Sequence, residues 1–276
     1  MINTKIGIIG GGNMGRAIAG GLLRGGMHAT DILIAEPLEA QCEYLRKELY
    51  GTMVTQDNAT VAAAAETLLF AVKPQILKPV CTGLADTVQR HKPLIVSIAA
   101  GPCIDDIEAW LGGHLSVVRV MPNQPALIDQ GISALIANAR TDAAGRDLAE
   151  KIMLTVGQVV WLESESLMDG VTAVSGTGPA YMYLLIDVMI EAAIEFGIDA
   201  DTARTLAVET ARGATSLAAA ETESMRKMIE RVSSPGGTTI AAFEHLDASD
   251  VRGIFAAAID AARNRAAELA KEAAAK

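Results

Sequence analysis

The chain has 276 residues, of which half are apolar and few are aromatic, and it carries a formal net charge of -10. This length can bury one large core or two ordinary ones, so a globular protein of two domains is expected. The acidic excess argues against nucleic acid as a partner, because a surface that binds a phosphate backbone needs a basic stripe.

The first residues and the apolar segments predict neither export nor a membrane span. Residues 1–5 lead straight into a strand-like segment, without the basic start and cleavage site of a signal peptide. The longest apolar runs are broken by Gly, Lys or Asp well short of the ~20 residues that cross a bilayer. We therefore expect a cytoplasmic protein that does not bind membranes.

The cysteines and histidines are few and scattered. Cys42, Cys81 and Cys103 are odd in number and widely spaced, which fits neither a disulfide framework nor a CxxC motif. The four histidines form no HxxxH or HxxE pair that would hold a metal ion. We expect reduced cysteines that serve packing, and no metal.

The first part of the chain alternates short β-branched runs with helical stretches. Nearly continuous apolar strands of this kind are typical of a parallel sheet covered on both faces. Two later runs, 131–136 and 158–161, flank a helical segment over 142–154 and could extend the sheet. The pattern predicts a Rossmann-like, doubly wound and mostly parallel α/β sheet. Its first five expected strands are 6–9, 32–35, 68–72, 94–98 and 117–120.

After Glu163 the β-branched runs disappear, and Ala, Leu, Met and Glu recur at helical spacing. We therefore expect two domains, 1–163 and 164–276, the second all helical. Small residues on its apolar faces permit close helix packing, although alanine could simply raise helix propensity. Helices with such faces bury too little alone, so we expect this domain to dimerise with its copy. The longest expected helices are 181–196, 201–219 and 250–271, and the tail 271–276 resembles frayed helix.

A glycine-rich turn follows the first expected strand and opens a helix. Gly10, Gly12 and Gly15 match GxGxxG in the context that a dinucleotide-binding turn requires. Gly10 allows the tight turn, Gly12 lets the backbone approach a pyrophosphate, and Gly15 lets the helix pack closely. The free amides of the helix start, at Asn13 and Met14, favour phosphate. The alternative is a tight turn without a ligand, but the start of a βαβ series favours a dinucleotide.

Glu36 follows the second expected strand, about 24 residues beyond Gly12, near the spacing at which an acidic residue binds the ribose hydroxyls of NADH. A carboxylate here would repel the 2'-phosphate of NADPH, and Arg46 lies a turn or more further along, so this interpretation favours NADH. Glu36 could equally be an acid near a helix start before Pro37, where it would stabilise the helix dipole. Both interpretations stay open.

Three loops follow later strands, at 71–75, 97–101 and 121–125. Each contains Gly or Pro, which could be ordinary turn chemistry. Loops at the ends of parallel strands point into the ligand crevice of an open α/β sheet. We expect these three to line one edge of that crevice, where their small residues leave room for a flat nicotinamide ring.

Two segments of the helical part, 175–181 and 232–239, place proline near a helix start. With Ser234 as N-cap and Pro235 in the first turn, the amides from Gly236 to Thr239 would point outward unpaired. Such a helix start binds a carboxylate readily. A capped helix with a flexible start is the alternative, but paired glycines are poor helix formers, which favours a binding site.

The motifs GGGNMG, AVKP, SIAAG, MPNxP, SGTGPAY and SPGGTT occur in this order over essentially the whole chain. Together they resemble pyrroline-5-carboxylate reductase, and SPGGTT is the most specific of them. The resemblance implies reduction of 1-pyrroline-5-carboxylate to L-proline with NADPH or NADH, the last step of proline biosynthesis. It also implies a homodimer with interlocked helical domains, often assembled as a decamer of five dimers. Gln124 replaces the usual Thr, and Glu36 stands where many relatives have polar or basic residues.

The resemblance also assigns roles to residues. The substrate carboxylate is expected at Gly237 and Thr238, and the ring nitrogen at the hydroxyl of Thr239, the catalytic candidate. A threonine is too weak an acid to protonate strongly, so it would relay a proton from water or receive an iminium already protonated. This helix start is expected to come from the partner chain. The implied substrate-binding residues are Val232, Ser234, Gly236, Gly237, Thr238 and Thr239.

On the cofactor side, the glycine turn, the second strand's acid and the three strand-end loops match the family's contacts. The implied cofactor-binding residues are Gly10, Gly12, Asn13, Met14, Gly15, Glu36, Asn58, Ala71, Val72, Lys73, Pro74, Ala99, Ala100, Gly101, Pro122 and Asn123.

Two other functions remain as alternatives. One is a reductase of similar two-domain design that acts on β-hydroxy acids or acyclic imines, and the other is a nucleotide-sensing binding protein. Hydroxy-acid dehydrogenases of similar two-domain design place a catalytic lysine on the long helix after an SGxGPA-like segment, and residues 181–196 contain none, which favours an imine substrate. A nucleotide sensor without chemistry would not need an intact SPGGTT segment. Oxidation of NADH in the presence of 1-pyrroline-5-carboxylate would separate the three functions.

Overall fold

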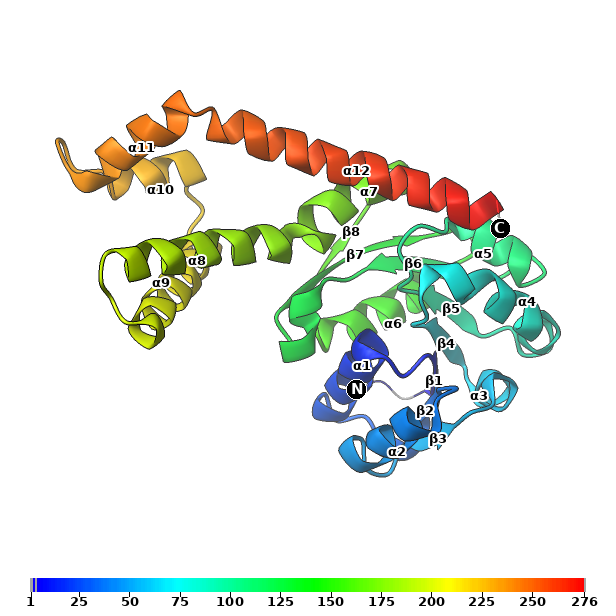
Figure 1. Cartoon of the computed structure of the whole chain (residues 1–276). Coiled ribbons are helices and arrows are strands. Elements are labelled where there is room, and N and C mark those ends of the chain that lie inside the picture. The colour runs from blue at the N-terminus through cyan, green and yellow to red at the C-terminus, as the bar shows by residue number, and fades with distance from the viewer. Residues whose placement is uncertain (1, 3, 276) are drawn as a thin grey trace. The chain divides into compact units, whose positions relative to one another are not determined.

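The computed structural model describes Ile2 and residues 4–275, which form two compact units (Figure 1). The first unit comprises the described residues of the ranges 1–177 and 262–276, and the second comprises residues 178–261. The chain passes from the first unit to the second after residue 177, later than the expected boundary between 163 and 164. The end of the last helix belongs to the first unit. The predicted domain boundary stays a prediction.

The first unit contains an eight-stranded sheet with the order β3-β2-β1-β4-β5-β6-β7-β8. Its neighbouring strands run parallel except for β6 and β7, which are antiparallel. The predicted doubly wound, mostly parallel sheet is therefore confirmed, including its extension by two later strands. The strands are β1 (Ile6–Ile9), β2 (Ile32–Ala35), β3 (Met53–Thr55), β4 (Thr67–Phe70), β5 (Leu94–Ser97), β6 (Val117–Met121), β7 (Gly131–Ala137) and β8 (Gly157–Trp161).

Strand β3 was not expected from the sequence. It has three residues and stands at the edge of the sheet, where it pairs in parallel with β2. Its first side chain, Met53, is 42% exposed, so the segment shows no continuous apolar run of the kind that a buried strand has. The ladder to β2, with Ala35 opposite Thr55, forms it instead.

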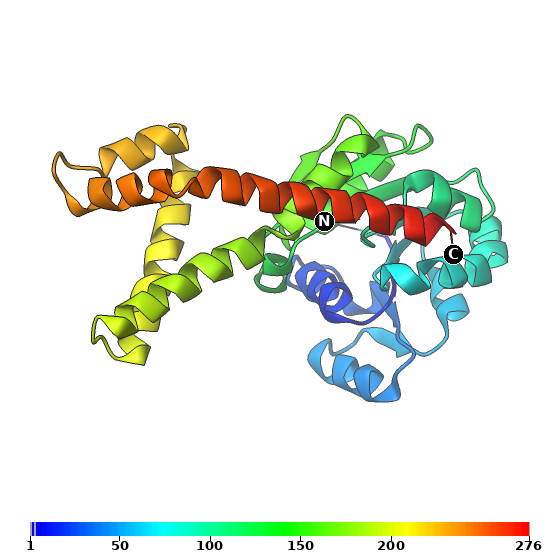
Figure 2. The same ribbon diagram turned by 45° about the horizontal axis from the view of Figure 1, so that its top comes forward.

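Helices cover both faces of the sheet (Figures 1 and 2). One core joins α1, α2 and α6 to the sheet, and the other joins α3, α4 and α5. Helix α4 shows how the sequence achieves this, because Leu77, Cys81, Leu84 and Val88 recur at helical spacing and all are buried. The helices are α1 (Asn13–Arg24), α2 (Glu39–Glu48), α3 (Asn58–Ala64), α4 (Pro74–His91), α5 (Ile104–Trp110) and α6 (Ala143–Leu154).

Beyond residue 163 the described chain is helical, as predicted. A short helical series leaves the sheet through α7 (Met168–Val171) and a π-helix, η4 (Thr172–Gly176). The second unit then consists of helices, with α12 continuing from it into the first unit. These helices are α8 (Gly178–Glu195), α9 (Ala200–Ala220), α10 (Met225–Arg231), α11 (Thr238–Ala248) and α12 (Val251–Ala275).

The C-terminal tail is helical as far as Ala275, and Lys276 lies outside the described residues; the expected fraying stays a prediction. The tail is rich in Ala, Lys and Glu, which are strong helix formers. Arg265 also pairs with Glu268 at 2.7 Å and with Glu272 at 2.9 Å along the helix surface. These contacts favour a continuous helix.

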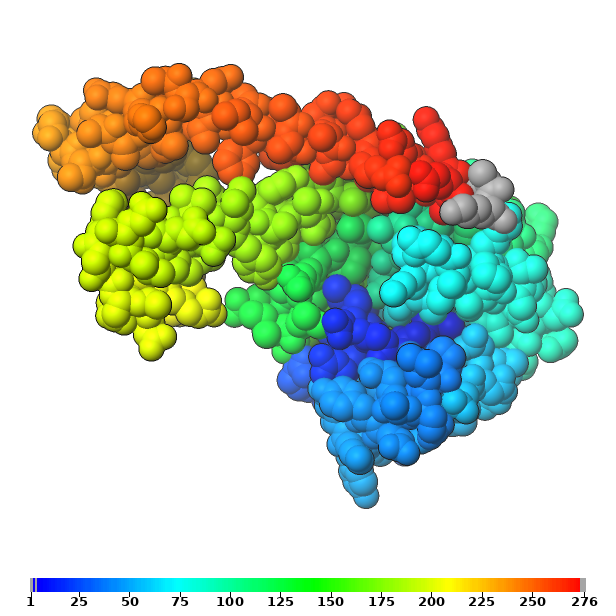
Figure 3. All heavy atoms as spheres, viewed as in Figure 1, coloured from blue at the N-terminus to red at the C-terminus, as the bar shows by residue number. Residues whose placement is uncertain are grey.

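Helix α8 is apolar, yet none of its residues is buried within the structure described here. Atoms of α8 and α9 lie at the surface in the space-filling view (Figure 3).

The helical stretch 165–195 is also long and apolar enough to cross a membrane, by length and composition only. The sequence predicted no span, because Gly, Lys or Asp interrupts its longest apolar runs. An exposed apolar face of this kind indicates a surface that something covers. Its large exposed side chains include Met182, Tyr183, Leu184, Leu185, Val188, Met189 and Ile194.

A partly buried ion pair fixes the start of the helical series on the sheet. Arg119 of β6 has a side chain only 6% exposed, and its guanidinium lies 2.8 Å from a carboxylate oxygen of Glu165. The same oxygen accepts a hydrogen bond of 2.9 Å from the amide of Ile104, at the start of α5. Glu165 therefore connects a central strand, a helix start and the chain that leaves the sheet.

We expect Glu165→Ala to lower the free energy of unfolding by about 2 kcal/mol or more, because the guanidinium of Arg119 would stay buried without its partner. The neighbouring Glu163 is exposed, and Glu163→Ala should change stability by less than about 0.5 kcal/mol. Urea unfolding of both variants measures this difference. Equal stability of the two variants would contradict the role of the pair.

Candidate active site

The glycine turn has the close backbone contacts that its motif predicts. Gly10 has a φ of +106°, and its amide donates to the carbonyl of Ala35 at 2.8 Å. A Cβ on Gly10 would lie 2.7 Å from the carbonyl oxygen of Ala71, and one on Gly15 would lie 2.2 Å from that of Gly10. Only glycine fits these two positions, so β1, α1 and the loop after β4 pack directly together.

The start of α1 is open on its outer side. Gly12 is its N-cap and offers no side chain, and the first intrahelical bond runs from the amide of Arg16 to the carbonyl of Gly12 at 2.9 Å. The amides of Asn13, Met14 and Gly15 precede that bond. A Cβ on Gly12 would meet no atom within 4 Å, so the space above these amides is free. This arrangement fits the pyrophosphate of a dinucleotide.

Glu36 lies directly after β2 and is 8% exposed. One carboxylate oxygen accepts a hydrogen bond of 2.9 Å from the amide of Gly11, and the other accepts one of 3.2 Å from the amide of Leu38. Helix α2 begins at Glu39, which is the acid in its first turn. Glu36 therefore joins the glycine turn to the loop after β2, and its contact with a ribose stays a prediction.

The loops after β4 and β5 lie beside the glycine turn, because these strands follow β1 in the sheet. The amide of Ala71 donates to the carbonyl of Ile9 at 2.8 Å, and the amide of Ile98 donates to that of Phe70 at 3.1 Å. The structure thus brings seven of the predicted cofactor residues to one edge of the sheet. They are Ala71, Val72, Lys73, Pro74, Ala99, Ala100 and Gly101.

Asn58 stands at the other end of this edge, as the first residue of α3. The preceding residue, Asp57, is the N-cap and accepts hydrogen bonds from the amides of Ala59 and Thr60. The carboxyl end of β3 is held beside that of β2, since the amide of Glu36 donates to the carbonyl of Thr55 at 2.9 Å. Asn58 therefore lies on the side of the sheet where Glu36 ends β2.

Asn123, which follows Pro122 after β6, uses its side chain within the protein. Its Oδ1 accepts a hydrogen bond of 2.9 Å from the amide of Ile132, and its Nδ2 donates to the carbonyl of Ser175 at 3.2 Å. Ser175 belongs to the π-helix η4, a form that is frequent at functional sites. Asn123 thus fixes the SGTGPAY segment to the end of β6, and its cofactor contact stays a prediction.

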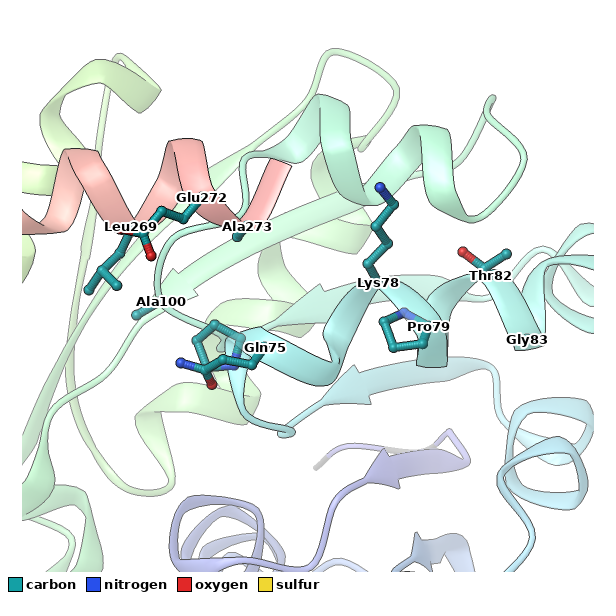
Figure 4. A pocket seen from close by; sticks show the side chains of 10 residues that line it. Gln75, Lys78, Pro79, Thr82, Gly83, Ala100, Leu269, Glu272 and Ala273 are labelled. Atoms are coloured by element: carbon teal, nitrogen blue, oxygen red, sulfur yellow. The ribbon is translucent and has the colours of Figure 1, made fainter. Parts of the chain in front are cut away.

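The end of α12 contributes to this region, which the sequence did not indicate. It lies over the loop after β5, since a Cβ on Gly101 would be 3.6 Å from the backbone of Leu269 and Ala270. A cavity of about 680 Å³ separates this helix end from α4 (Figure 4). No motif marks the tail, so only the fold reveals it. The cavity is lined by Pro74, Gln75, Lys78, Pro79, Thr82, Gly83, Ala100, Leu269, Glu272 and Ala273.

The predicted N-cap of the last motif is wrong: α11 begins at Thr238 and its N-cap is Gly237, not Ser234. The amide of Gly237 donates to the carbonyl of Ser234 at 2.9 Å, which closes a turn with proline at its second position. Gly236 has a φ of +70°, as the third position of a type II turn requires, so it cannot continue a helix. The free amides of this helix start therefore belong to residues further along the chain than the sequence predicted.

Those amides belong to Thr238, Thr239 and Ile240, because the first intrahelical bond of α11 runs from the amide of Ala241 to the carbonyl of Gly237. They lie at the end of the loop that joins α10 to α11, two helices that lie side by side in both ribbon views (Figures 1 and 2). An eleven-residue helix with no side chain capping its start can bind an anion there.

The loop before α11 is held by its own contacts. The hydroxyl of Thr239 donates to the carbonyl of Val232 at 3.3 Å. Arg231, just before the loop, lies 2.8 Å from Glu221 and 3.1 Å from Glu223. The hydrogen bond from Arg231 lowers the pKa of Glu221, which keeps this carboxylate charged near neutral pH. These contacts orient the loop that carries the predicted substrate residues.

The thiols and possible metal ligands offer no competing centre among the residues that the structure describes. No group of three or more His, Cys, Asp or Glu side chains is placed to hold a metal ion there. Burial raises the pKa of Cys81 to about 12 and is the main cause that raises that of Cys103 to about 11. Both thiols are therefore poor nucleophiles near neutral pH.

Comparison with known proteins agrees with this arrangement. Residues 165–269 match the family model for pyrroline-5-carboxylate reductase dimerisation, and residues 5–101 match the model described as NADP oxidoreductase, coenzyme F420-dependent. The pyrroline-5-carboxylate reductase of Pseudomonas aeruginosa is 41% identical over 273 residues, which cover 99% of each chain. The chain belongs to the pyrroline-5-carboxylate reductase family. The resemblance found in the sequence motifs is thereby confirmed.

Solved structures support the same family. A pyrroline-5-carboxylate reductase from Coxiella burnetii is 37% identical, with a TM-score of 0.91 over 97% of this chain and 99% of that one. The pyrroline carboxylate reductase of Plasmodium falciparum, solved with NADP bound, is 25% identical with a TM-score of 0.87, covering 98% of this chain and 99% of that one. As a member of this family the chain is an NAD(P)H-dependent oxidoreductase with a dimerisation domain.

We expect Gly12→Ala to weaken NADH binding by about tenfold or more, because its methyl group would stand above the open amides of α1. Stability should change by less than about 1 kcal/mol, since no protein atom lies within 4 Å of the new carbon. Gly15→Ala should instead lower the free energy of unfolding by about 2 kcal/mol or more. Fluorescence titration with NADH and urea unfolding separate these effects, and unchanged binding by Gly12→Ala would contradict the assignment.

Proposed function

We propose that the chain reduces 1-pyrroline-5-carboxylate to L-proline with NADH or NADPH, the last step of proline biosynthesis. The observation that carries this proposal is a pair of open helix starts, at α1 and α11, in a chain of this reductase family. Both the cofactor and the substrate carry anions that such helix starts bind. The chemistry itself is a hydride transfer to a cyclic C=N bond.

The residues of the first unit would hold the cofactor. The amides at the start of α1 would bind its pyrophosphate, and the loops 71–74 and 99–101 would lie along the nicotinamide ring. Ala99 is buried, and the backbone of Gly101 at φ +106° leaves no side chain in the way. When bound, the reduced nicotinamide supplies the hydride. The chain contributes mainly position and a suitable electrostatic environment.

The start of α11 would hold the substrate. The amides of Thr238, Thr239 and Ile240 offer hydrogen bonds to its carboxylate, together with the positive end of the helix dipole. Gly237 has no side chain that would block this approach. Val232 and Ser234, on the loop before the helix, would close the pocket around the five-membered ring.

Thr239 would face the ring nitrogen. Its hydroxyl hydrogen is directed at the carbonyl of Val232, so its oxygen is left to accept a hydrogen bond. An acceptor suits a nitrogen that already carries a proton. Of the two routes that the sequence leaves open, this contact favours a substrate that arrives as the iminium, whose carbon accepts a hydride more readily. Thr239 then orients the ring and need not act as an acid.

We expect Thr239→Ala to lower kcat by about tenfold or more, a barrier change of ~1.4 kcal/mol. Thr239→Ser is the matched control, because it keeps the hydroxyl that accepts from the ring nitrogen, and it should stay within about threefold of the unchanged enzyme. Steady-state kinetics at saturating NADH measure both variants. An alanine variant with unchanged kcat would exclude this role for Thr239.

The assembly follows from the apolar face of α8. Members of a dimerisation family bury such a face against a second copy, and we propose that the partner chain, not a lipid bilayer, covers it here. We further propose that five dimers form a decamer in the cytoplasm, as the family resemblance implies. The net charge of -10 agrees with a protein that avoids anionic membranes and nucleic acid.

The proposed assembly predicts the mass in solution. One chain has a mass of 28.8 kDa, and we expect no monomer at micromolar concentration because separation would expose the apolar face of α8. Analytical ultracentrifugation without detergent should give a whole multiple of the dimer mass, and ten chains if the decamer forms. Replacing Leu184 and Val188 of α8 by Glu should yield smaller species. A stable monomer of the unchanged chain would contradict the proposal.

A further inference from the structure

The region beyond β2 carries acidic residues, whose negative charge opposes the binding of a phosphate group. The chain from Glu36 to Tyr44 contains Glu36, Glu39 and Glu43 but no Lys or Arg. In dinucleotide-binding folds this region meets the adenosine ribose, and a carboxylate here selects NAD whereas an arginine accommodates the 2'-phosphate of NADP. The family's cofactor can be either, and the charge of these residues is the feature of this chain that bears on the difference.

The carboxylate of Glu36 is fixed in place. It is 8% exposed and accepts hydrogen bonds from the amides of Gly11, at 2.9 Å, and Leu38, at 3.2 Å. A charged group held by two backbone amides cannot swing away without leaving both donors unpaired. Gln41 also holds the glycine turn in place, since its Nε2 donates to the carbonyl of Gly11 at 2.7 Å. The negative charge therefore stays beside the glycine turn.

A second carboxylate, that of Asp57, follows the neighbouring strand β3. Gln56 donates from its Nε2 to the carbonyl of Pro37 at 2.9 Å, which holds the turn after β3 against the loop after β2. Asp57 follows in that turn, and its hydrogen bond from the hydroxyl of Thr60 is the main cause that lowers its pKa, so it is ionised at neutral pH. The two neighbouring strand ends thus both carry negative charge.

The nearest basic residue along α2 is already engaged. Arg46 lies 2.8 Å from a carboxylate oxygen of Glu39 and donates to the carbonyl of Val54 at 3.3 Å. Arg46 neutralises the charge of Glu39 by this contact. It does not offset the charges of Glu36 and Asp57. A phosphate, with a charge of about -1.5 to -2, would meet like charges here.

We propose that Glu36 is the specificity-determining residue of the cofactor site and makes this chain prefer NADH over NADPH. The inference rests on the proposed function only in that a nicotinamide dinucleotide binds at the glycine turn. The P. falciparum relative with NADP bound shows what that protein accepts, and the charge after β2 distinguishes this chain by its own residues.

Equilibrium binding without substrate tests the inference separately from the reductase activity. Isothermal titration of the full chain should give a dissociation constant for NADH at least about tenfold lower than for NADPH. The fragments 5'-AMP and adenosine 2',5'-bisphosphate should show the same order, which assigns the difference to the 2'-phosphate. Equal or tighter binding of NADPH would overturn the proposal, whatever the turnover of 1-pyrroline-5-carboxylate.

Substitutions test whether the charge of Glu36 causes the preference for NADH. Glu36→Gln removes the charge but keeps an oxygen that can accept from an amide, and the preference for NADH should fall at least about threefold. Glu36→Asp keeps the charge and should keep a preference for NADH. Asp86→Asn, an equal charge change at an exposed position of α4, should leave the ratio of dissociation constants unchanged.

A further variant removes the charge of Asp57 while keeping the local fold. Asp57→Asn keeps an N-cap acceptor for α3 while removing its charge, so the chain should fold normally and lose part of its discrimination against NADPH. Thermal unfolding of each variant shows whether the fold is retained. An unchanged ratio of dissociation constants in folded Glu36→Gln would overturn the assignment of Glu36.

Discussion

Unpaired backbone amides at a helix start are the physical feature on which the function depends. An α-helix leaves its first amides without internal partners, and they must bind water, a side chain or an anion. At α1 and at α11 the N-cap is a glycine without a side chain to fill that role. The amides of both starts are therefore not capped by a side chain. The sheet positions the first beside three strand-end loops, and a proline-glycine turn shapes the second.

The glycine turn alone shows that a dinucleotide can bind, but it does not identify a reaction. Other reductases share such a turn, whereas the start of α11 presents amides, a bare glycine and the Thr239 hydroxyl in one short segment. We propose that an imine with a carboxylate next to its ring nitrogen uses each of these groups. No lysine stands on α8, so the residues fit an imine better than the hydroxy acids that lysine-dependent dehydrogenases oxidise.

The sequence predicted most of the sheet, because buried parallel strands are continuous apolar runs, and it missed β3, whose three residues are held by pairing and not by burial. It predicted the open helix start in SPGGTT but placed the cap at Ser234, since the turn chemistry of Pro235 and Gly236 competes with helix there. The end of α12 above Gly101 depends on tertiary packing alone.

The central claim is that this chain transfers a hydride to a cyclic imine. The most direct measurement follows the absorbance of NADH, and separately of NADPH, after addition of 1-pyrroline-5-carboxylate to the purified chain, with the product identified by mass spectrometry. The account predicts that the cofactor is oxidised in proportion to the L-proline formed. Absence of turnover with both cofactors, by folded protein that binds NADH, would contradict it.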